Sequence, residues 1–236
     1  MGMALCRELP SLAVPSGVSV VIAARNEEAS IAAAVDSAYA AGADEVIVVD
    51  GASSDHTATI ARAHRARVVP SEPMRSRQFN RGAHEAANET IIFLHGDTTL
   101  PPGAAHAAAG TSANFGGFRL RFDQHTMKLR IAAALINFRT AITRCPWGDQ
   151  AQFVRRTAFL AAGGFREIAI MEDYDLARRM RRLGRTAVIA DKVTTSARRL
   201  LQKGAVRTVI LNWRIIAAWH CGVDPDTLAR WYRGSE

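Results

Sequence analysis

ETIIFLHGDTTLPP, residues 89–102, is the stretch of sequence that decides the fold. Its residues 91–94 are continuously apolar, which is typical of a strand buried on both faces of a parallel sheet. His95, Gly96 and Asp97 follow, so a carboxylate stands just past the strand end, where open α/β sheets bind their ligands. A carboxylate at that place suits Mg²⁺ that also carries a diphosphate. The alternative is that Asp97 only caps the following turn.

Strand and helix signals alternate on both sides of this stretch. Apolar runs predict strands at residues 18–23, 45–50, 67–70, 90–95, 115–122, 151–154 and 186–190. Helical spacing predicts helices that end at residues 41, 66 and 87, and two more at residues 127–143 and 171–183. The alternation predicts a mostly parallel sheet with right-handed crossovers. The first strand–helix turn, AARNEEAS at residues 23–30, lacks glycine, which excludes a dinucleotide fingerprint and a P-loop there.

The charge of the chain is unevenly distributed. Residues 17–100 hold 7 Lys and Arg against 11 Asp and Glu, whereas residues 101–236 hold 22 against 10. The second half should therefore face an anionic partner, such as phosphate groups or an acidic membrane surface. Nucleic acid is not expected, because the basic half lacks interleaved aromatic residues and any known binding module. The alternative for the cluster of arginines at residues 178–185 is a solvated helix face.

The cysteines and the first 17 residues indicate the cellular compartment of the protein. Cys6, Cys145 and Cys221 are odd in number and have no metal-ligand spacing, which indicates a reducing compartment. The first 17 residues lack a charged region followed by a long apolar core, so no signal peptide is expected. We therefore predict a cytoplasmic protein.

Two apolar segments of the basic half resemble membrane-surface helices. Residues 127–144 and 206–221 combine apolar faces with Lys and Arg, and both are too short or too charged to span a bilayer. They predict peripheral binding at the inner face of the cell membrane. The alternative is that both helices form core or the interface of a homodimer.

Six short motifs, in order, identify a family resemblance over about residues 17–200. They are VSVVIAARN (18–26), DGASSDHT (50–57), LHGD (94–97), GDQAQFVR (148–155), GGF (163–165) and ED (172–173). Together they resemble the family 2 glycosyltransferases of the GT-A fold. RSRQFNRG (75–82) and TTSARR (194–199) are similar to a bacterial subgroup of small family-2-like transferases. The resemblance implies an α/β, Rossmann-like, mostly parallel sheet flanked by helices, with a C-terminal helical tail.

The same resemblance implies a single glycosyltransferase domain over residues 1–236. Residues 17–100 would bind the nucleotide sugar, residues 101–200 would form the acceptor and catalytic half, and residues 201–236 would form the tail.

The implied nucleoside pocket lies at the ends of the first two strands. Asp50 can accept a hydrogen bond from a base imide or a ribose hydroxyl, and the resemblance implies a contact to uracil. Asn26 and Glu27 would complete this pocket. The alternative for Asn26 and for Glu28 is helix capping, and Asp55 is expected to cap as well.

The implied diphosphate site combines cations with a metal. Arg75 and Arg77 would face the phosphates, since guanidinium groups suit diphosphate oxygens, and Arg198 would close over them. Asp97 would be the surviving carboxylate of the DxD metal motif of the family, with His95 at the first position. The predicted cofactor is Mg²⁺ or Mn²⁺. For Arg198 the alternative is an ordinary surface arginine.

The implied catalytic groups lie in the second half. Asp149 and Gln150 would meet the donor sugar, and Trp147 would stack on a sugar face or pack as core. Glu172 and Asp173 begin a helix, whose dipole favours ionised carboxylates. The resemblance makes Asp173 the base that takes the proton of the acceptor hydroxyl, while Glu172 orients the acceptor or caps the helix.

The predicted function is inverting, metal-assisted transfer of a sugar from a nucleotide-diphosphate sugar, UDP-sugar being favoured. The acceptor is not identified, although a lipid-linked or hydrophobic one fits the apolar helices. A sugar-1-phosphate nucleotidyltransferase shares the sheet but needs a glycine-rich first turn, which is missing. The remaining alternative is a non-catalytic module that binds a sugar nucleotide or anionic lipid.

Overall fold

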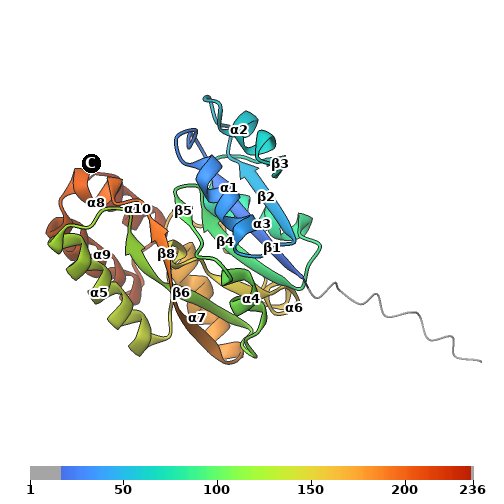
Figure 1. Cartoon of the computed structure of the whole chain (residues 1–236). Coiled ribbons are helices and arrows are strands. Elements are labelled where there is room, and N and C mark those ends of the chain that lie inside the picture. Colours follow the sequence, from blue (N-terminus) through green and yellow to red (C-terminus); the bar gives the residue numbers. More distant parts are fainter. Residues whose placement is uncertain (1–16, 235–236) are drawn as a thin grey trace, which may run out of the picture.

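The computed structural model describes residues 17–234. Residues 1–16, which include Cys6 and nearly all of the leader, and residues 235–236 lie outside this range. Figure 1 shows a central sheet with helices on both sides and a group of helices from the last part of the chain at one end. Within the described range, no helix is both long enough and apolar enough to cross a bilayer.

The strands of the described residues form one eight-stranded sheet with the order β3-β2-β1-β4-β7-β6-β8-β5. In chain order they are β1 (Val18–Ala24), β2 (Glu45–Asp50), β3 (Arg67–Pro70), β4 (Thr90–His95), β5 (Thr98–Thr99), β6 (Phe115–Phe122), β7 (Phe153–Arg155) and β8 (Thr186–Thr195).

The helices begin and end at the following residues. They are α1 (Ile31–Ala40), α2 (Thr57–Ala63), α3 (Arg75–Glu85), α4 (Ala104–Ala109), α5 (Met127–Thr143), the 3₁₀ helix η1 (Gly148–Gln150), α6 (Arg156–Ala161), α7 (Glu172–Leu183), α8 (Arg198–Lys203), α9 (Ala205–His220) and α10 (Pro225–Arg233).

The predicted parallel sheet is confirmed in its first half. β3, β2, β1 and β4 run parallel, and β7 is antiparallel to both of its neighbours, β4 and β6. The register pairs Ala24 of β1 with Asp50, and Ala23 with His95. The ends of β1, β2 and β4 therefore lie level at one edge of the sheet. Because successive strands are added in opposite directions from β1, this edge has the crevice in which such sheets bind ligands.

Alternate side chains of the central strands feed two separate cores. Val20 and Ile22 pack under α1, α2, α4 and α5, whereas Val21, Ile47 and Val49 pack under α3, α6 and α7. Strands buried on both faces must be apolar at every position, which explains the continuous runs in β1, β2 and β4.

Several predicted boundaries are wrong for local reasons. The helix predicted through residue 66 ends at Ala63, since Arg65 has a φ of +68°. The strand predicted at residues 151–154 starts only at Phe153, because Ala151 has a φ of +46°. The last strand does not stop at residue 190 but continues to Thr195, because after a bulge at residues 190–191 its pairing with β6 resumes at Lys192. β5, α4 and α6 were not predicted. α8, α9 and α10 form the predicted C-terminal helical tail, which begins at Arg198 rather than at residue 201.

Candidate active site

Four predicted site residues lie at or just after the ends of β1, β2 and β4, and we call them the strand-end cluster: Asn26, Glu27, Asp50 and Asp97. The loop after β4 can approach the loop after β1 because Gly96 has no side chain. A Cβ atom on Gly96 would lie 3.2 Å from Glu27 Cγ. The close approach brings Asp97 to the same edge as the nucleoside residues predicted from the sequence.

The loops after β1 and β2 hold one another through hydrogen bonds. Asn26 Oδ1 accepts from Ser54 N at 2.9 Å, and Asn26 N donates to Ser53 Oγ at 3.0 Å. Asp50 accepts from Ser53 N at 3.3 Å and from the hydroxyl of the same serine. Asn26 adopts a φ of +54°, a conformation that asparagine tolerates better than most residues. Asn26 thus holds the loop after β2 through hydrogen bonds. The alternative role considered for Asn26 was helix capping.

The start of α2 uses two acidic side chains. Asp55 accepts hydrogen bonds from the backbone N–H and the hydroxyl of Thr57, and Glu28 accepts from His56 N at 3.1 Å. The hydrogen bond from the Thr57 hydroxyl lowers the pKa of Asp55. Both acids therefore satisfy backbone groups at a helix start, as the capping alternative proposed for them.

Glu27 connects the strand-end cluster to the helical tail. Its carboxylate accepts from Ser30 Oγ at 3.0 Å and from Arg198 Nη2 at 3.2 Å. Arg198 is the first residue of α8 and is 171 positions away in the sequence. The tail thus delivers a guanidinium group to the predicted nucleotide site.

A second group of predicted residues lies at η1 and at the start of α7. We call Trp147, Asp149, Glu172 and Asp173 the helix-start cluster. Asp173 Oδ2 accepts from Gly148 N, and Asp173 Oδ1 accepts from Tyr174 N, both at 2.7 Å. These two backbone hydrogen bonds fix the orientation of the carboxylate.

Gly148 is where the end of β4 meets this second cluster. A Cβ atom on Gly148 would lie 3.0 Å from His95 Nε2 and 3.2 Å from Asp173 Oδ2. The imidazole and the carboxylate therefore border the same point, which only a residue without a side chain leaves open.

Arg75 lies between the two clusters. Arg75 Nη1 donates to Glu172 Oε1 at 3.1 Å, joining α3 to α7 across 97 positions of sequence. The pKa of Arg75 is raised, most by Glu172 and further by Asp173, Tyr232 and Asp97. Burial raises the pKa of Glu172, and Arg75 opposes that rise. The Arg75 guanidinium group thus pairs with Glu172 and is also influenced by the charges of Asp173 and Asp97.

Arg139, one of the basic residues of α5, lies at the site, and no role at the site was predicted for it. Its guanidinium carbon lies 3.4 Å from the ring centroid of Trp147, and its Nη2 donates to Gln150 Oε1 at 3.1 Å. Burial lowers the pKa of Arg139. One feature of the sequence agrees with this placement. Arg139 is three residues after Ile136, so both lie on the same side of the helix, and Ile136 packs against the core.

Asp149 occupies a desolvated position next to Arg139. Burial raises its pKa to about 6; Arg139 opposes this rise, and Asp173 adds to it. Asp149 Oδ1 and Trp147 Nε1 are both buried, and neither has a hydrogen-bond partner among the described residues. Buried polar atoms are normally paired, so these two atoms are suited to meet groups of a ligand.

Gln150 is engaged by the protein itself. Its Oε1 accepts from Trp147 N at 3.1 Å and from Thr140 Oγ1 at 2.8 Å, while its Nε2 donates to Phe118 O at 3.0 Å. The side chain is fully buried and holds η1 against β6 and α5. Its predicted contact with substrate stays a prediction.

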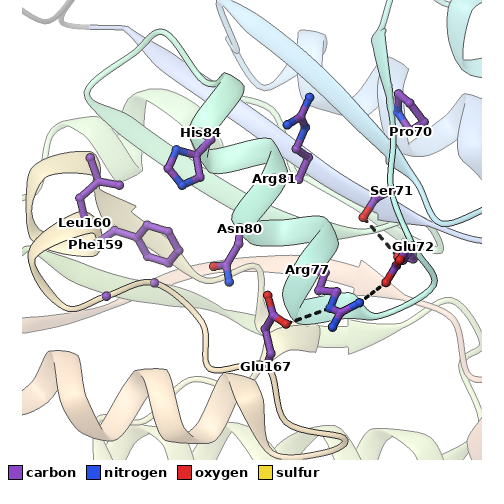
Figure 2. A pocket seen from close by; sticks show the side chains of 12 residues that line it. Pro70, Ser71, Glu72, Arg77, Asn80, Arg81, His84, Phe159, Leu160 and Glu167 are labelled. Atoms are coloured by element: carbon purple, nitrogen blue, oxygen red, sulfur yellow. Dashed lines mark hydrogen bonds and ion pairs between the residues drawn. The ribbon is translucent and has the colours of Figure 1, made fainter.

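Arg77 points to a different part of the molecule from Arg75. Figure 2 shows Arg77 between Glu72 and Glu167, at a cavity of about 750 Å³ on the outer side of α3. Arg77 Nε lies 2.9 Å from Glu167 Oε2. Among the predicted site residues, only Arg77 lines this cavity. Its predicted role at the diphosphate therefore has no support from its contacts.

The metal-binding prediction concerns Asp97 and His95. The Asp97 carboxylate accepts a long hydrogen bond, 3.4 Å, from Thr98 Oγ1, and the His95 ring stacks on Phe79 with centroids 6.0 Å apart. Across residues 17–234, no three His, Cys, Asp or Glu side chains are grouped to hold a metal ion. Magnesium ions often take one or two carboxylates and complete their shell with phosphate and water. Asp97 therefore fits a cation that is shared with a diphosphate.

The sequence of residues 19–125 matches the model of the family described as Glycosyl transferase family 2. The match covers 107 of the 236 residues, in the first half of the chain. No curated protein matches the sequence closely enough to count as a relative. The predicted resemblance to family 2 glycosyltransferases is confirmed over these residues, and the predicted α/β fold is confirmed by the solved structures that follow.

Solved structures of the GT-A fold are similar to this chain. One is S. aureus TarS 1-349, with a TM-score of 0.61 at 17% identity over 77% of this chain and 60% of that chain. For TarS 1-349 in complex with UDP-GlcNAc the TM-score is 0.59 at 17% identity, over 76% of this chain and 58% of that chain. The chain described here thus spans about 60% of the TarS fragment.

Another solved structure is glucosyl-3-phosphoglycerate synthase from Mycobacterium tuberculosis, in complex with Mn²⁺, UDP and glucosyl-3-phosphoglycerate. Its TM-score is 0.59 at 20% identity, over 88% of this chain and 80% of the synthase. At such identities the likeness to the synthase and to TarS establishes the fold.

Proposed function

We propose that the protein transfers a sugar, with inversion, from a nucleoside-diphosphate sugar to an acceptor hydroxyl. A UDP-sugar is the favoured donor. The observation that carries the proposal is the position of Arg75, which pairs with Glu172 and feels the charges of Asp97 and Asp173. A guanidinium group at the sheet edge suits a diphosphate, which would leave from the face of the sugar opposite to the acceptor and its base.

The donor would bind at the strand-end cluster. Asp50, Asn26 and Glu27 would hold the nucleoside, in loops that hydrogen bonds already order. Arg75 and Arg198 would face the diphosphate, and Arg198 would exchange Glu27 for phosphate oxygens. The complexes of TarS with UDP-GlcNAc and of the mycobacterial synthase with UDP, both on the same fold, support a uridine nucleotide.

The chemical step would use Asp173 as the base. Its carboxylate takes the proton of the acceptor hydroxyl as that oxygen attacks the anomeric carbon. The new bond forms on one face of the sugar while the bond to the diphosphate oxygen breaks on the opposite face, so the configuration inverts. Mg²⁺ or Mn²⁺ at Asp97 would supply charge stabilisation for the departing diphosphate. The synthase structures with Mn²⁺ or Mg²⁺ and UDP support this choice of metal.

The sugar and acceptor would lie against η1. Asp149 Oδ1 and Trp147 Nε1, buried without a partner among the described residues, offer an acceptor and a donor for hydroxyl groups. His95 and Gly148 would form the floor between this pocket and Asp173. We include a lipid-linked or hydrophobic acceptor at the inner face of the cell membrane, for which the exposed apolar residues of α5 are the support.

Calorimetry with nucleoside diphosphates tests the donor and metal parts. UDP should bind more tightly with Mn²⁺ than with EDTA, and Asp97→Ala should remove that difference. Equal affinity in both buffers for both proteins would exclude a metal at Asp97. Thermal shifts with UDP-, GDP- and dTDP-sugars then rank the donors, because a ligand of the native state raises the melting temperature.

Hydrolysis of the donor separates an enzyme from a module that only binds. Slow release of UDP from the best donor, lost in Asp173→Asn, supports the proposed transferase. Tight donor binding with no release in any acceptor extract would favour the non-catalytic module.

A further inference from the structure

α5 carries apolar side chains on two opposite faces. Its inner face buries Leu129, Ala132 and Ala133 against the sheet. Its outer face exposes five large apolar side chains, 54–66% of each, and we call them the α5 stripe: Met127, Ile131, Leu135, Phe138 and Ile142. Their spacing of three or four residues places them on one side of the helix. An apolar stripe of this length left in water requires a partner.

The charged residues of α5 itself and of its C-cap are all positive. Lys128, Arg130 and Arg144 are exposed beside it, and residues 127–144 contain no Asp or Glu. Residues 101–236 as a whole hold 22 Lys and Arg against 10 Asp and Glu. A stripe of apolar residues bordered by cations is the arrangement of a helix that lies in the interface of an anionic bilayer.

We propose that the α5 stripe docks the protein onto the surface of an anionic membrane. α5 lies at the outside of the molecule (Figure 1), and its 17 residues present about 25 Å of helix to that surface. The apolar side chains would enter the boundary of the acyl chains, and Lys128, Arg130 and Arg144 would face lipid phosphates.

A second copy of the chain fits the stripe less well. Pairing two α5 helices would bring cations near cations with no acid on either helix to neutralise them. The acid just before the helix, Asp123, is already bonded to Ala197 N at 2.9 Å. Charge complementarity therefore favours the anionic bilayer over self-association.

Docking would also place the active site at the bilayer. Arg139, on the same helix, contacts Trp147 and Gln150, so α5 is a wall of the helix-start cluster. If the proposed transferase function holds, an acceptor carried by a lipid would reach this cluster directly from the surface. This part of the inference rests on that function; the docking itself does not.

Co-sedimentation with vesicles tests the docking. The full chain should pellet with vesicles of phosphatidylcholine and phosphatidylglycerol at 7:3 in low salt, less in high salt, and not with phosphatidylcholine alone. Leu135→Glu and Phe138→Glu should each weaken binding roughly tenfold or more, since each removes an apolar contact and adds a repelled charge. Leu183→Glu, at a site 55% exposed on α7, is the matched control and should bind nearly as the wild type does.

Two results would overturn the inference. One is wild-type protein left in the supernatant with anionic vesicles at low salt. The other is equal loss of binding in Leu183→Glu and Phe138→Glu, which would leave no special role for the stripe. A concentration-dependent dimer that Phe138→Glu dissociates, without vesicle binding, would assign the stripe to self-association instead. UDP affinity of Phe138→Glu in solution should equal that of the wild type, and it reports on the donor site separately.

Discussion

The strand-end cluster and the helix-start cluster hold their polar and acidic side chains in different ways. At the strand ends, Asp50 and Asn26 are held by hydroxyls and backbone N–H groups of nearby loops, close to solvent. At the helix start, Asp149 and Glu172 are largely desolvated, and cations from distant helices stand beside them. The first arrangement fixes polar side chains at the sheet edge with little loss of hydration. The second removes water from carboxylates, which raises their pKa.

The largest expected effect is on the base of the helix-start cluster. Asp173→Asn keeps the shape but cannot take a proton, so turnover should fall by roughly two to four orders of magnitude. Affinity for UDP should change little, because the residue is assigned to the acceptor side. Glu172→Gln should cost less. Turnover is measured with the donor and acceptor, and UDP affinity by calorimetry. If Asp173→Asn keeps a nearly normal rate and Asp149→Asn is inactive, the base is Asp149 in η1 instead.

The next effect concerns the ion pair between the clusters. Arg75→Met leaves Glu172 buried without its cation and should lower the free energy of unfolding by about 1–3 kcal/mol, a range reduced because Arg75 is 40% exposed. Adding Glu172→Gln should restore part of the loss. Arg77→Met is the matched control: its partners Glu72 and Glu167 are 72% and 53% exposed, so it should change stability by about 0.5 kcal/mol or less.

Urea unfolding of these single and double variants measures the coupling. If Arg75→Met and Arg77→Met lower the free energy of unfolding equally, the proposed difference between a buried ion pair and a surface ion pair is wrong.

Asp149 should make stability depend on pH. Burial raises its pKa from 3.8 to about 6, so between these values the folded carboxyl keeps a proton that the unfolded chain has released. The folded state then binds more protons, and its contribution to stability falls as the pH rises through this window. Asp149→Asn should match the wild type near pH 4 and be more stable at pH 7, by on the order of 2 kcal/mol. A constant difference across this range would contradict the assigned cause.

The smallest effect has the opposite sign and lies beside the strand-end cluster. The hydrogen bond from Thr57 lowers the pKa of Asp55, so its ionised form stabilises the fold above the ordinary value of 3.8. This contribution is lost as the pH falls through 3.8 toward the lowered value. Asp55→Asn should be slightly less stable than the wild type at pH 7, and the difference should shrink in acid. Thermal melts across pH decide the sign, and a variant more stable at pH 7 would refute it.

Sequence patterns predicted the strands that are buried on both faces, because such strands must be apolar at every position. β8 shows the limit of this signal. Its residues Asp191 and Lys192 are exposed, so the apolar run breaks at residue 190, yet pairing with β6 carries the strand to Thr195. Patterns of side chains do not record hydrogen bonds to a strand far away in the chain.

The sequence by itself determined the resemblance to family 2 glycosyltransferases, the parallel sheet and the carboxylates at the strand ends, since these depend on local runs and on turns next to them. Only the tertiary structure decided how the charges are shared. Arg75 and Arg77 are two positions apart on one helix, yet Arg75 joins Glu172 and Arg77 joins Glu72 and Glu167. Arg139 turned inward to Trp147, and the α5 stripe stayed outside. The reason is physical: the partners of these side chains come from distant segments, and the packing of helices on the sheet sets which of them meet.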